Sequence, residues 1–189
     1  MSKNKTRKKS TFTYNDTDYK SSDGMLTTVW GPALWHYMHV MSFNYPVEPT
    51  EENKKEYKNF ILNLKYLLPC KYCRVNFKKN LKQLPITASD MKNRETFSRY
   101  VYNLHELINT MLNKKSGLSY VDAKERYEHF RARCVINKPR RKKTLKIVKE
   151  IGCTEPLYGK KSKCIIKIVP QDNKGTTFQI DKKCIKRRV

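Results

Sequence analysis

The sequence lacks any long apolar run, so no segment reaches the roughly 18 apolar residues that a membrane-spanning helix requires. Its lysine-rich N-terminus is followed by polar residues and not by the apolar stretch of a secretory signal peptide. Six glycines and eight prolines in 189 residues are too few for a collagen-like chain or a pure linker. We therefore expect a globular protein without a signal peptide or transmembrane segment.

Acidic residues are also scarce, because 17 Asp and Glu face 41 Lys and Arg and leave a net charge of +24. The excess is uneven: residues 1–26 carry +3, residues 27–134 carry +8 and residues 135–189 carry +13. Most aromatic and long aliphatic side chains lie in the middle range. This distribution predicts a polar flexible N-terminal arm, a compact domain at 27–134 and a basic C-terminal extension.

Apolar residues recur at helical spacing through the middle range. We expect five helices, namely Pro32 to Tyr45, Thr50 to Leu68, Cys70 to Gln83, Asn93 to Asn113 and Ser119 to Phe130. Pro32 is expected in the first turn of its helix, and Thr50 and Ser119 as N-caps. No alternating strand pattern occurs between residues 27 and 134, so the domain is predicted to be an all-α bundle.

The C-terminal extension has a different pattern. Short β-branched runs at 145–151, 164–169 and 176–180 predict a small β-hairpin or three short strands. Its basic blocks have two interpretations, which are non-specific electrostatic contact with nucleic acid or acidic partners, and solubilising charge. Interleaved aromatic residues are too few for a base-stacking surface, so specific nucleic-acid recognition is not predicted.

The pair Cys70-Lys-Tyr-Cys73 carries the clearest chemistry. Two cysteines three residues apart at a helix start face the same side and can close an exchangeable disulfide. The helix N-terminus, Lys71 and Arg74 favour the thiolate form. A helical bundle offers no electron acceptor of its own, and this points to a bound cofactor.

Two other interpretations of the pair remain open at this stage. A structural zinc site in a helical adaptor needs four ligands, and the chain has no second Cys-x-x-Cys. A basic nucleic-acid-binding accessory protein could keep the pair as a structural disulfide. A thioredoxin-like site is disfavoured because that motif follows a strand, whereas the neighbourhood here is helical.

Several short motifs stand in a fixed order along the chain. They are Trp35-His-Tyr-Met-His39, Tyr45-Pro46, Cys70-Lys-Tyr-Cys73, Leu104-His105-Glu-Leu-Ile108-Asn109, Leu112, Lys114 and Glu125-Arg126-Tyr127. Over roughly residues 29–134 this order resembles the Erv/ALR family of FAD-linked sulfhydryl oxidases. The opening Trp30-Gly-Pro is similar to the branch that large DNA viruses encode.

The resemblance implies a four-helix bundle with a short fifth helix that holds FAD beside the cysteine pair. It implies that Cys70 is the exposed interchange thiol and Cys73 the flavin-proximal thiol. Electrons would pass from protein thiols through this disulfide to FAD and then to O2, giving H2O2. The cofactor-binding residues that it implies are Gly31, Trp35, His39, Tyr45, His105, Asn109, Leu112, Lys114 and Tyr127, with no metal. A homodimer through the first helices is also implied and, for a viral protein, a place in the host cytoplasm or virion.

The chain departs from the family pattern at several positions. Glu106 replaces an asparagine and Tyr127 a tryptophan, while Tyr102 and Tyr120 replace the two cysteines that join the last helices in animal relatives. Packing must therefore substitute for that disulfide. The second dithiol that many relatives carry on a tail is missing. The extension contains Cys153, Cys164 and Cys184. These cysteines either act as a shuttle dithiol or are inert or structural, and we favour the second interpretation.

Overall fold

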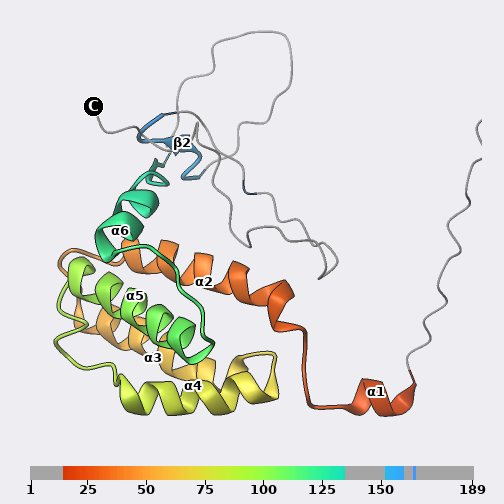
Figure 1. Ribbon diagram of the computed structural model, residues 1–189. Helices are drawn as coiled ribbons and strands as arrows, with labels where there is room; N and C mark the ends of the chain where they lie inside the picture. Colours follow the sequence, from red (N-terminus) through yellow and green to blue (C-terminus); the bar gives the residue numbers. More distant parts are fainter. Residues whose placement is uncertain (1–14, 135–151, 160–163, 165–189) are drawn as a thin grey trace, which may run out of the picture.

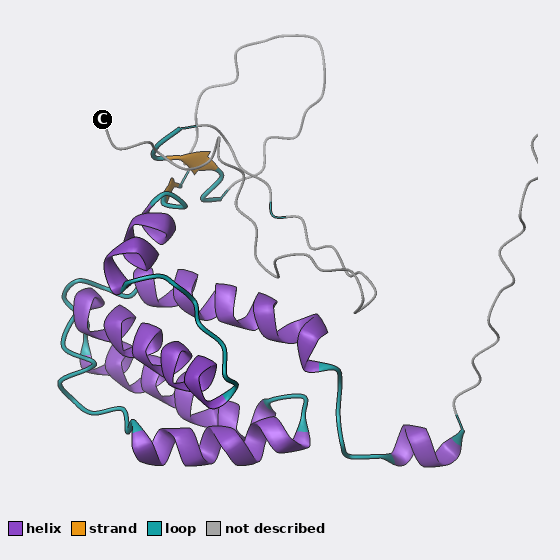
Figure 2. Cartoon of the chain, viewed as in Figure 1, coloured by secondary structure: helices purple, strands orange, loops and turns teal. Residues whose placement is uncertain are grey.

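The computed structural model describes residues 15–134, 152–159 and 164, and these parts of the chain are mainly helical (Figures 1 and 2). The elements in chain order are α1 (Asp16–Lys20), α2 (Thr27–Phe43), α3 (Glu51–Leu67), α4 (Lys71–Gln83), α5 (Arg94–Met111), α6 (Tyr120–Glu128), β1 (Ala132–Arg133) and β2 (Glu155–Pro156). The predicted helical fold is confirmed, and the five expected helices are α2 to α6. Among the described helices, none is both long and apolar enough to cross a bilayer.

Helices α2 to α5 form the bundle, and α6 is the short fifth helix. Helix α2 packs against α5 and α6, α3 packs against α4, and α5 contacts both α4 and α6. Figure 1 shows α1 standing apart from this bundle, at the end of an extended segment. The core consists of apolar side chains from all four bundle helices, including Met38, Ile61, Leu64, Phe77, Phe97, Val101 and Leu104.

Polar caps set the helix starts where the sequence predicts them. Thr50 and Asn53 form a reciprocal capping box at the start of α3, and Ser119 and Asp122 form one at the start of α6. Each cap satisfies backbone N–H groups that have no partner within the helix and contributes about 1 kcal/mol. The predicted N-caps of α3 and α6 are therefore confirmed.

The predicted start of the first bundle helix is wrong. Helix α2 begins at Thr27, five residues before Pro32, so the proline lies inside the helix. Its missing N–H removes one intrahelical hydrogen bond in the second turn of the helix. A tertiary contact lies directly before the start, because Met25 N–H donates to the Pro69 carbonyl at 2.6 Å, and the Trp30 indole N–H donates to the Met25 carbonyl at 3.2 Å.

The last two helices are joined by packing instead of by a disulfide, as the sequence predicts. The rings of Tyr102 and Tyr120 meet edge to face with 5.7 Å between their centroids. The Tyr102 hydroxyl donates to the Leu118 carbonyl at 2.7 Å. The hydroxyls of Tyr120 and Ser98 are hydrogen bonded at 2.8 Å.

A small sheet lies partly inside the range expected to be free of strands. Strands β1 and β2 are antiparallel, with Ala132 opposite Pro156. A two-residue strand is too short to display an alternating pattern, which is why the sequence does not predict β1. The predicted strands at 145–151, 164–169 and 176–180 lie outside the described residues, apart from residue 164.

Candidate active site

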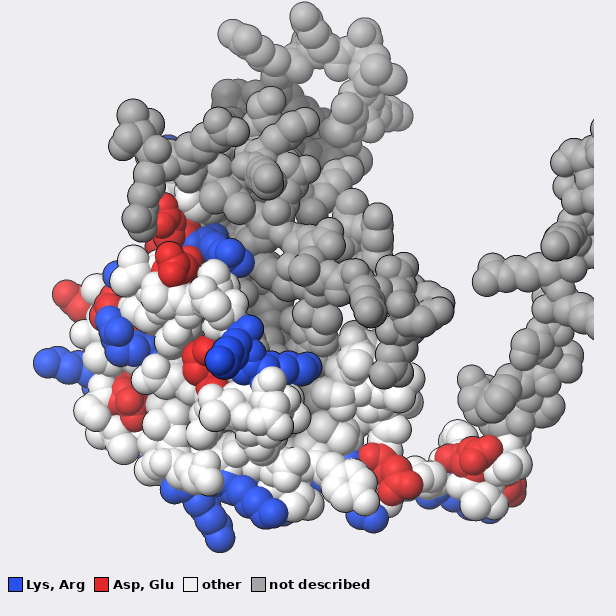
Figure 3. All heavy atoms as spheres, in the orientation of Figure 1, with Lys and Arg blue, Asp and Glu red and all other residues white. Residues whose placement is uncertain are grey.

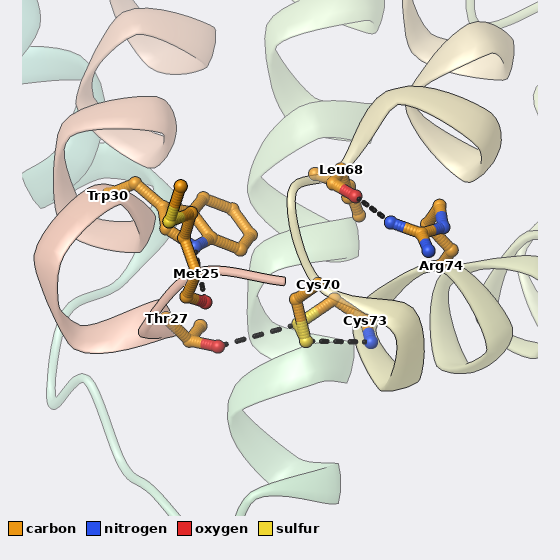
Figure 4. Close-up of a disulfide and its surroundings, with 7 residues drawn as sticks. All are labelled: Met25, Thr27, Trp30, Leu68, Cys70, Cys73 and Arg74. Atoms are coloured by element: carbon orange, nitrogen blue, oxygen red, sulfur yellow. Dashed lines mark hydrogen bonds between the residues drawn. A yellow bond between two sulfur atoms is a disulfide. The ribbon is translucent and has the colours of Figure 1, made fainter. Parts of the chain in front are cut away.

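The disulfide between Cys70 and Cys73 lies at the start of α4, with 5.1 Å between the two Cα atoms (Figure 4). Cys70 is the N-cap residue, and its Sγ accepts a hydrogen bond from the Cys73 backbone N–H at 3.2 Å. Pro69 comes directly before the pair and ends α3. Both cysteines are half-buried, and Cys73 also packs against the hydrophobic core. The reactive pair thus sits where a helix N-terminus presents positive potential.

Positive side chains occur along the whole of α4, and Lys71 and Arg74 lie near its start. Helix α4 carries five Lys or Arg residues and no acidic residue, and Figure 3 shows blue side chains along the edge where α4 runs in Figure 1. Arg74 donates to the Leu68 carbonyl at 2.7 Å, and the Lys71 ammonium lies 3.7 Å from the Asp23 carboxylate. Positive charge and the helix dipole both favour a thiolate over a thiol.

The extended segment before α2 crosses the cysteine pair. We call residues 23–25 the strap. Met25 N–H donates to the Pro69 carbonyl at 2.6 Å, and Gly24 forms an antiparallel bridge with Cys70. Gly24 has a φ of +109°, and a Cβ there would lie 2.5 Å from the Pro69 carbonyl oxygen. Only glycine fits this close approach, so the strap fixes the backbone that carries the sulfurs.

A cluster of aromatic and imidazole rings joins α2, α5 and α6. Trp35 stacks on His105 with 3.9 Å between ring centroids, and His39 Nε2 lies 2.9 Å from His105 Nδ1. His39 also stacks on Tyr127 with 5.0 Å between ring centroids, and Phe43 stacks on the same Tyr127 ring at 5.4 Å. The structure therefore brings together four of the predicted cofactor-binding residues: Trp35, His39, His105 and Tyr127.

Burial keeps the two histidines of this cluster neutral. Burial, with the neighbouring imidazoles of His105 and His36, lowers the pKa of His39 to about 3. Burial also lowers the pKa of His105 to about 4, with a smaller contribution from Lys114. Within the described residues, His39 Nδ1 is buried and has no hydrogen-bond partner. A buried polar atom of this kind is satisfied when a ligand with a polar group binds beside it.

Two other predicted site residues lie apart from the ring cluster. Tyr45 is fully buried in the core, where its hydroxyl donates to the Met91 carbonyl at 3.0 Å. Gly31 is buried within α2, and a Cβ there would lie 3.4 Å from the Thr27 methyl group.

The remaining predicted residues are at the C-terminal end of α5. The Asn109 side-chain amide donates to Glu106 at 2.9 Å, so the residue that departs from the family pattern is its direct partner. Leu112 and Lys114 are exposed beyond this point, and the Lys114 backbone N–H donates to the Asn109 carbonyl at 2.8 Å.

Sequence reasoning misses some members of the site. His36 and Phe43 both contact the Tyr127 ring, at 5.7 and 5.4 Å between centroids. Their spacing of seven residues on α2 places them on one helix face, and this is the signal that could have found them. The strap is also missed, although Asp23-Gly24 is a turn signal in the sequence.

The other described cysteines do not form a ligand set. Cys134 is disulfide-bonded to Cys153, and Cys164 is free and exposed. The structural-disulfide interpretation of Cys153 is therefore supported, whereas Cys184 lies outside the described residues. Within the ranges that the structure describes, no three His, Cys, Asp or Glu side chains gather as metal ligands.

A pocket of about 570 Å³ lies near the start of α5 and is lined in part by Arg94, Glu95 and Lys124. It contains none of the predicted site residues. Two of its charges are paired, since Lys124 contacts Glu95 at 2.6 Å. The pocket does not include the cysteine pair, and it adjoins the ring cluster through Phe43, which lines it and stacks on Tyr127.

Comparisons with known proteins agree with this geometry. The chain is 34% identical over 99 residues to a probable FAD-linked sulfhydryl oxidase of Acanthamoeba polyphaga mimivirus, a match that covers 52% of this chain and 68% of that protein. It is 32% identical over 99 residues to an FAD-linked sulfhydryl oxidase of African swine fever virus, covering 52% of this chain and 80% of that protein. The predicted similarity to viral members is thereby confirmed.

Among solved structures, the chain is similar to the yeast Erv1 core, with a TM-score of 0.49 and 23% identity over 65% of this chain and 96% of that one. The family model described as Erv1/Alr matches residues 32–130, a range that includes the cysteine pair and all four residues of the ring cluster that were predicted to bind a cofactor. Because this match spans more than half of the 189 residues, the chain belongs to the Erv1/Alr family.

Proposed function

We propose that this chain is an FAD-linked sulfhydryl oxidase that forms disulfide bonds in thiol-containing protein substrates. The observation that carries the proposal is the Cys70–Cys73 disulfide at the positively charged start of α4, in a chain of the Erv1/Alr family. Relatives from mimivirus and African swine fever virus are named as oxidases of this type.

The residues present fit a flavin dinucleotide. Helix α2 touches the disulfide through Thr27 at one end and contributes His39 to the ring cluster 12 residues later, about 18 Å along the helix. An elongated ligand with a redox ring at one end and an aromatic base at the other suits this separation. Two further observations support the fit: the flat faces of Trp35 and Tyr127, and the buried His39 Nδ1 that has no partner among the described residues.

We assign the binding roles accordingly. Trp35, His39, His105 and Tyr127 would contact the adenosine part, where neutral imidazoles offer both a donor and an acceptor. Asn109 supports them from the adjacent turn of α5. Lys114 and Leu112 lie at the exposed end of this helix, where an ammonium group can pair with phosphate. Gly31 and Tyr45 shape the wall and the core behind the site.

The chemistry of the chain's own residues follows from the geometry. A substrate thiolate attacks Cys70 Sγ, the Cys70–Cys73 bond breaks, and Cys73 leaves as a thiolate while a mixed disulfide forms on Cys70. A second substrate thiolate then attacks the mixed disulfide, which releases the oxidised substrate and leaves both cysteines reduced. FAD, when bound, supplies the two-electron acceptor that reoxidises the pair and passes the electrons to O2, giving H2O2.

The visible absorption spectrum of the purified protein tests the proposal directly. We expect a flavin spectrum, and heat-released FAD near one equivalent per chain. A folded preparation that remains colourless after incubation with FAD contradicts the proposal. The zinc alternative predicts bound metal and no flavin.

The two cysteines are tested separately. Cys70→Ser and Cys73→Ser should each abolish thiol-dependent O2 consumption while leaving the flavin bound, because either change removes the disulfide. Only Cys70→Ser leaves the core-packed Cys73 thiolate, so only that variant should show long-wavelength charge-transfer absorption. Finding the absorption in Cys73→Ser instead would reverse the assignment of the two thiols.

A homodimer through the first bundle helices is part of the proposal. Helix α2 exposes Val29, Tyr37 and Val40, whose fractional exposures are 41%, 55% and 38%. Light scattering should give twice the chain mass, and Tyr37→Glu should give the monomer because it buries a charge at the interface. Because these relatives are viral, we propose that the chain acts in the host cytoplasm or in the virion.

A further inference from the structure

The hydroxyl of Thr27 lies 3.5 Å from Cys73 Sγ (Figure 4). The sulfur of a disulfide carries no hydrogen, so in this pair the hydroxyl is the donor. Thr27 is the first residue of α2, on a different element from the cysteine pair, and 46 residues separate the two in sequence. The contact therefore exists only because the fold brings the start of α2 to the start of α4.

Two hydrogen bonds and one glycine position the residues around Thr27. Met25 N–H donates to the Pro69 carbonyl, so the strap is bonded to the residue that precedes the cysteine pair. The Met25 carbonyl in turn accepts from the Trp30 indole, one turn into α2. Gly24 makes the approach of the two backbones possible because it has no Cβ. The donor is thus positioned by rigid neighbours on both sides.

The two sulfurs accept hydrogen bonds from different donors. Cys70 Sγ accepts from the backbone N–H of Cys73, at the N-terminus of α4. Cys73 Sγ accepts from the hydroxyl of the Thr27 side chain. A backbone donor is unaffected by mutation, whereas the side-chain donor can be removed without changing the helix.

We propose that Thr27 is a catalytic residue that stabilises Cys73 as the leaving thiolate when a substrate thiol attacks Cys70. This inference rests on the proposed oxidase function and assigns a residue to its first step. The substrate thiolate forms a bond to Cys70 Sγ, the electron pair of the broken disulfide goes to Cys73 Sγ, and no other oxidant is required. The negative charge develops on the atom that the hydroxyl already faces.

The stabilisation is selective for the charged state. A hydroxyl donates weakly to a neutral disulfide sulfur, and a hydrogen bond to an ionised acceptor is roughly twice as strong. Interactions that strengthen as charge develops accelerate the step, because they stabilise the transition state more than the ground state. A more stable leaving thiolate also leaves faster in thiol–disulfide exchange.

The test uses the full-length chain in a Cys70→Ser background, where Cys73 is the remaining thiol of the pair. The rate of iodoacetamide alkylation at Cys73 is measured against pH by mass spectrometry of the peptide that contains it, which separates it from Cys164. Thr27→Val removes the donor and keeps the side-chain shape. We expect the pH midpoint of alkylation to rise by about one pH unit, as expected for losing a hydrogen bond to a charged group.

Two variants separate chemistry from structure. Thr27→Ser keeps the hydroxyl and should restore the midpoint, while Thr28→Val makes the same change one residue further along α2 and should leave it unmoved. In the chain with both cysteines, Thr27→Val should lower kcat with dithiothreitol about threefold to tenfold at unchanged flavin content. Thr27→Ala should act like Thr27→Val.

The outcomes are distinct. If the pH midpoint of Cys73 alkylation is equal in Thr27→Val and Thr28→Val, the proposed role of Thr27 is wrong. A midpoint that rises equally in Thr27→Ser and Thr27→Val also overturns it, because the effect is then structural. Alkylation needs no flavin, so a protein that binds no FAD and oxidises no thiol refutes the proposed function while the midpoint still reports on Thr27.

Discussion

His39 and His105 share a hydrogen bond that requires at least one of the two rings to be neutral. Their facing nitrogens are 2.9 Å apart, and one ring must donate while the other accepts. Protonation makes every ring nitrogen a donor, so a positive charge on both rings would remove the hydrogen bond and place like charges in a buried site. The aromatic faces of Trp35 and Tyr127 on either side leave little room for water.

We therefore expect stability to fall on mild acidification. Both pKa values are below the usual 6.5, so the unfolded chain takes up protons first as the pH falls. The contribution of the two histidines to the free energy of unfolding is fully present above pH 6.5. It decreases toward pH 4 by about 1 kcal/mol per pH unit for each histidine. The lowered pKa values of Glu95 and Glu128 add losses only below about pH 4.5.

Urea unfolding between pH 7 and pH 4.5 measures this loss within the histidine window. The double variant His39→Asn/His105→Asn should show a flatter profile over the same range. An unchanged slope in that variant would mean that other groups are responsible.

At the scale of elements, the strap and the start of α4 act as one unit. The strap is held by backbone hydrogen bonds on both sides of Gly24, and its neighbour Asp23 lies near the Lys71 ammonium. The exposed ion pair contributes little by itself. Close backbone approach is the feature that a mutation can test.

Gly24→Ala should displace the strap. The new Cβ would meet the Pro69 carbonyl oxygen at 2.5 Å and would also strain a φ of +109°. Gly117→Ala is the matched control, because Gly117 also has a positive φ, of +67°, but has open space around it. We expect the control to lose about 1 kcal/mol of unfolding free energy.

The Gly24→Ala variant should lose more than the control, and protease cleavage at Lys20 should accelerate, since the strap would no longer be docked. An equal loss of unfolding free energy in the two variants would indicate that the strained backbone conformation, and not the close approach to Pro69, causes the loss. Thiol oxidation should also slow in Gly24→Ala, because Thr27 follows the strap.

Local signals account for what the sequence predicts well. Side-chain caps at Thr50, Asn93 and Ser119 act within one turn, so the starts of α3, α5 and α6 can be predicted from a few residues. The start of α2 has no side-chain cap, and the segment before it pairs with residue 69, which no local pattern encodes. Strand β1 depends likewise on a partner beyond residue 150.

In the candidate site too, contacts within one helix can be predicted from the sequence, whereas contacts between helices cannot. The i, i+4 spacing of Trp35 and His39 predicts that they share a helix face, and the structure confirms the contact at 6.2 Å between rings. The stacking of Trp35 on His105 joins α2 to α5, so it follows from the packing of the bundle. The family resemblance assigned both residues to one cofactor site, which residue periodicity alone could not do.

At the scale of the whole molecule, the basic extension is joined to the helical domain. Cys134 is bonded to Cys153, and Leu157 N–H donates to the Arg131 carbonyl at 2.8 Å. Arg131 itself is held within the domain, by Glu128 and by the Phe43 carbonyl. The domain boundary at residue 134 therefore remains a prediction that truncation can test.

Truncation after Lys138 should leave a folded domain that binds FAD and oxidises dithiothreitol, because the cysteine pair, the ring cluster and the contacts of the Arg131 side chain all precede it. Activity is compared with that of the full-length chain on dithiothreitol and on an acidic protein thiol, at low and high salt. The truncated chain could lose activity on the protein substrate alone. If high salt causes the same loss in the full-length chain, the extension recruits the substrate electrostatically. An insoluble or flavin-free product would move the boundary into the extension.

The strap also determines how a polypeptide substrate can be recognised. Many proteins capture extended peptides by β-augmentation, in which the guest strand bonds to a free backbone edge. Here the chain's own residues 23–25 already bond to residues 69–71, so the edge beside the interchange sulfur is filled. We therefore expect a guest to be selected by whether its sulfur can reach Cys70 and by its charge, with little dependence on its backbone pairing.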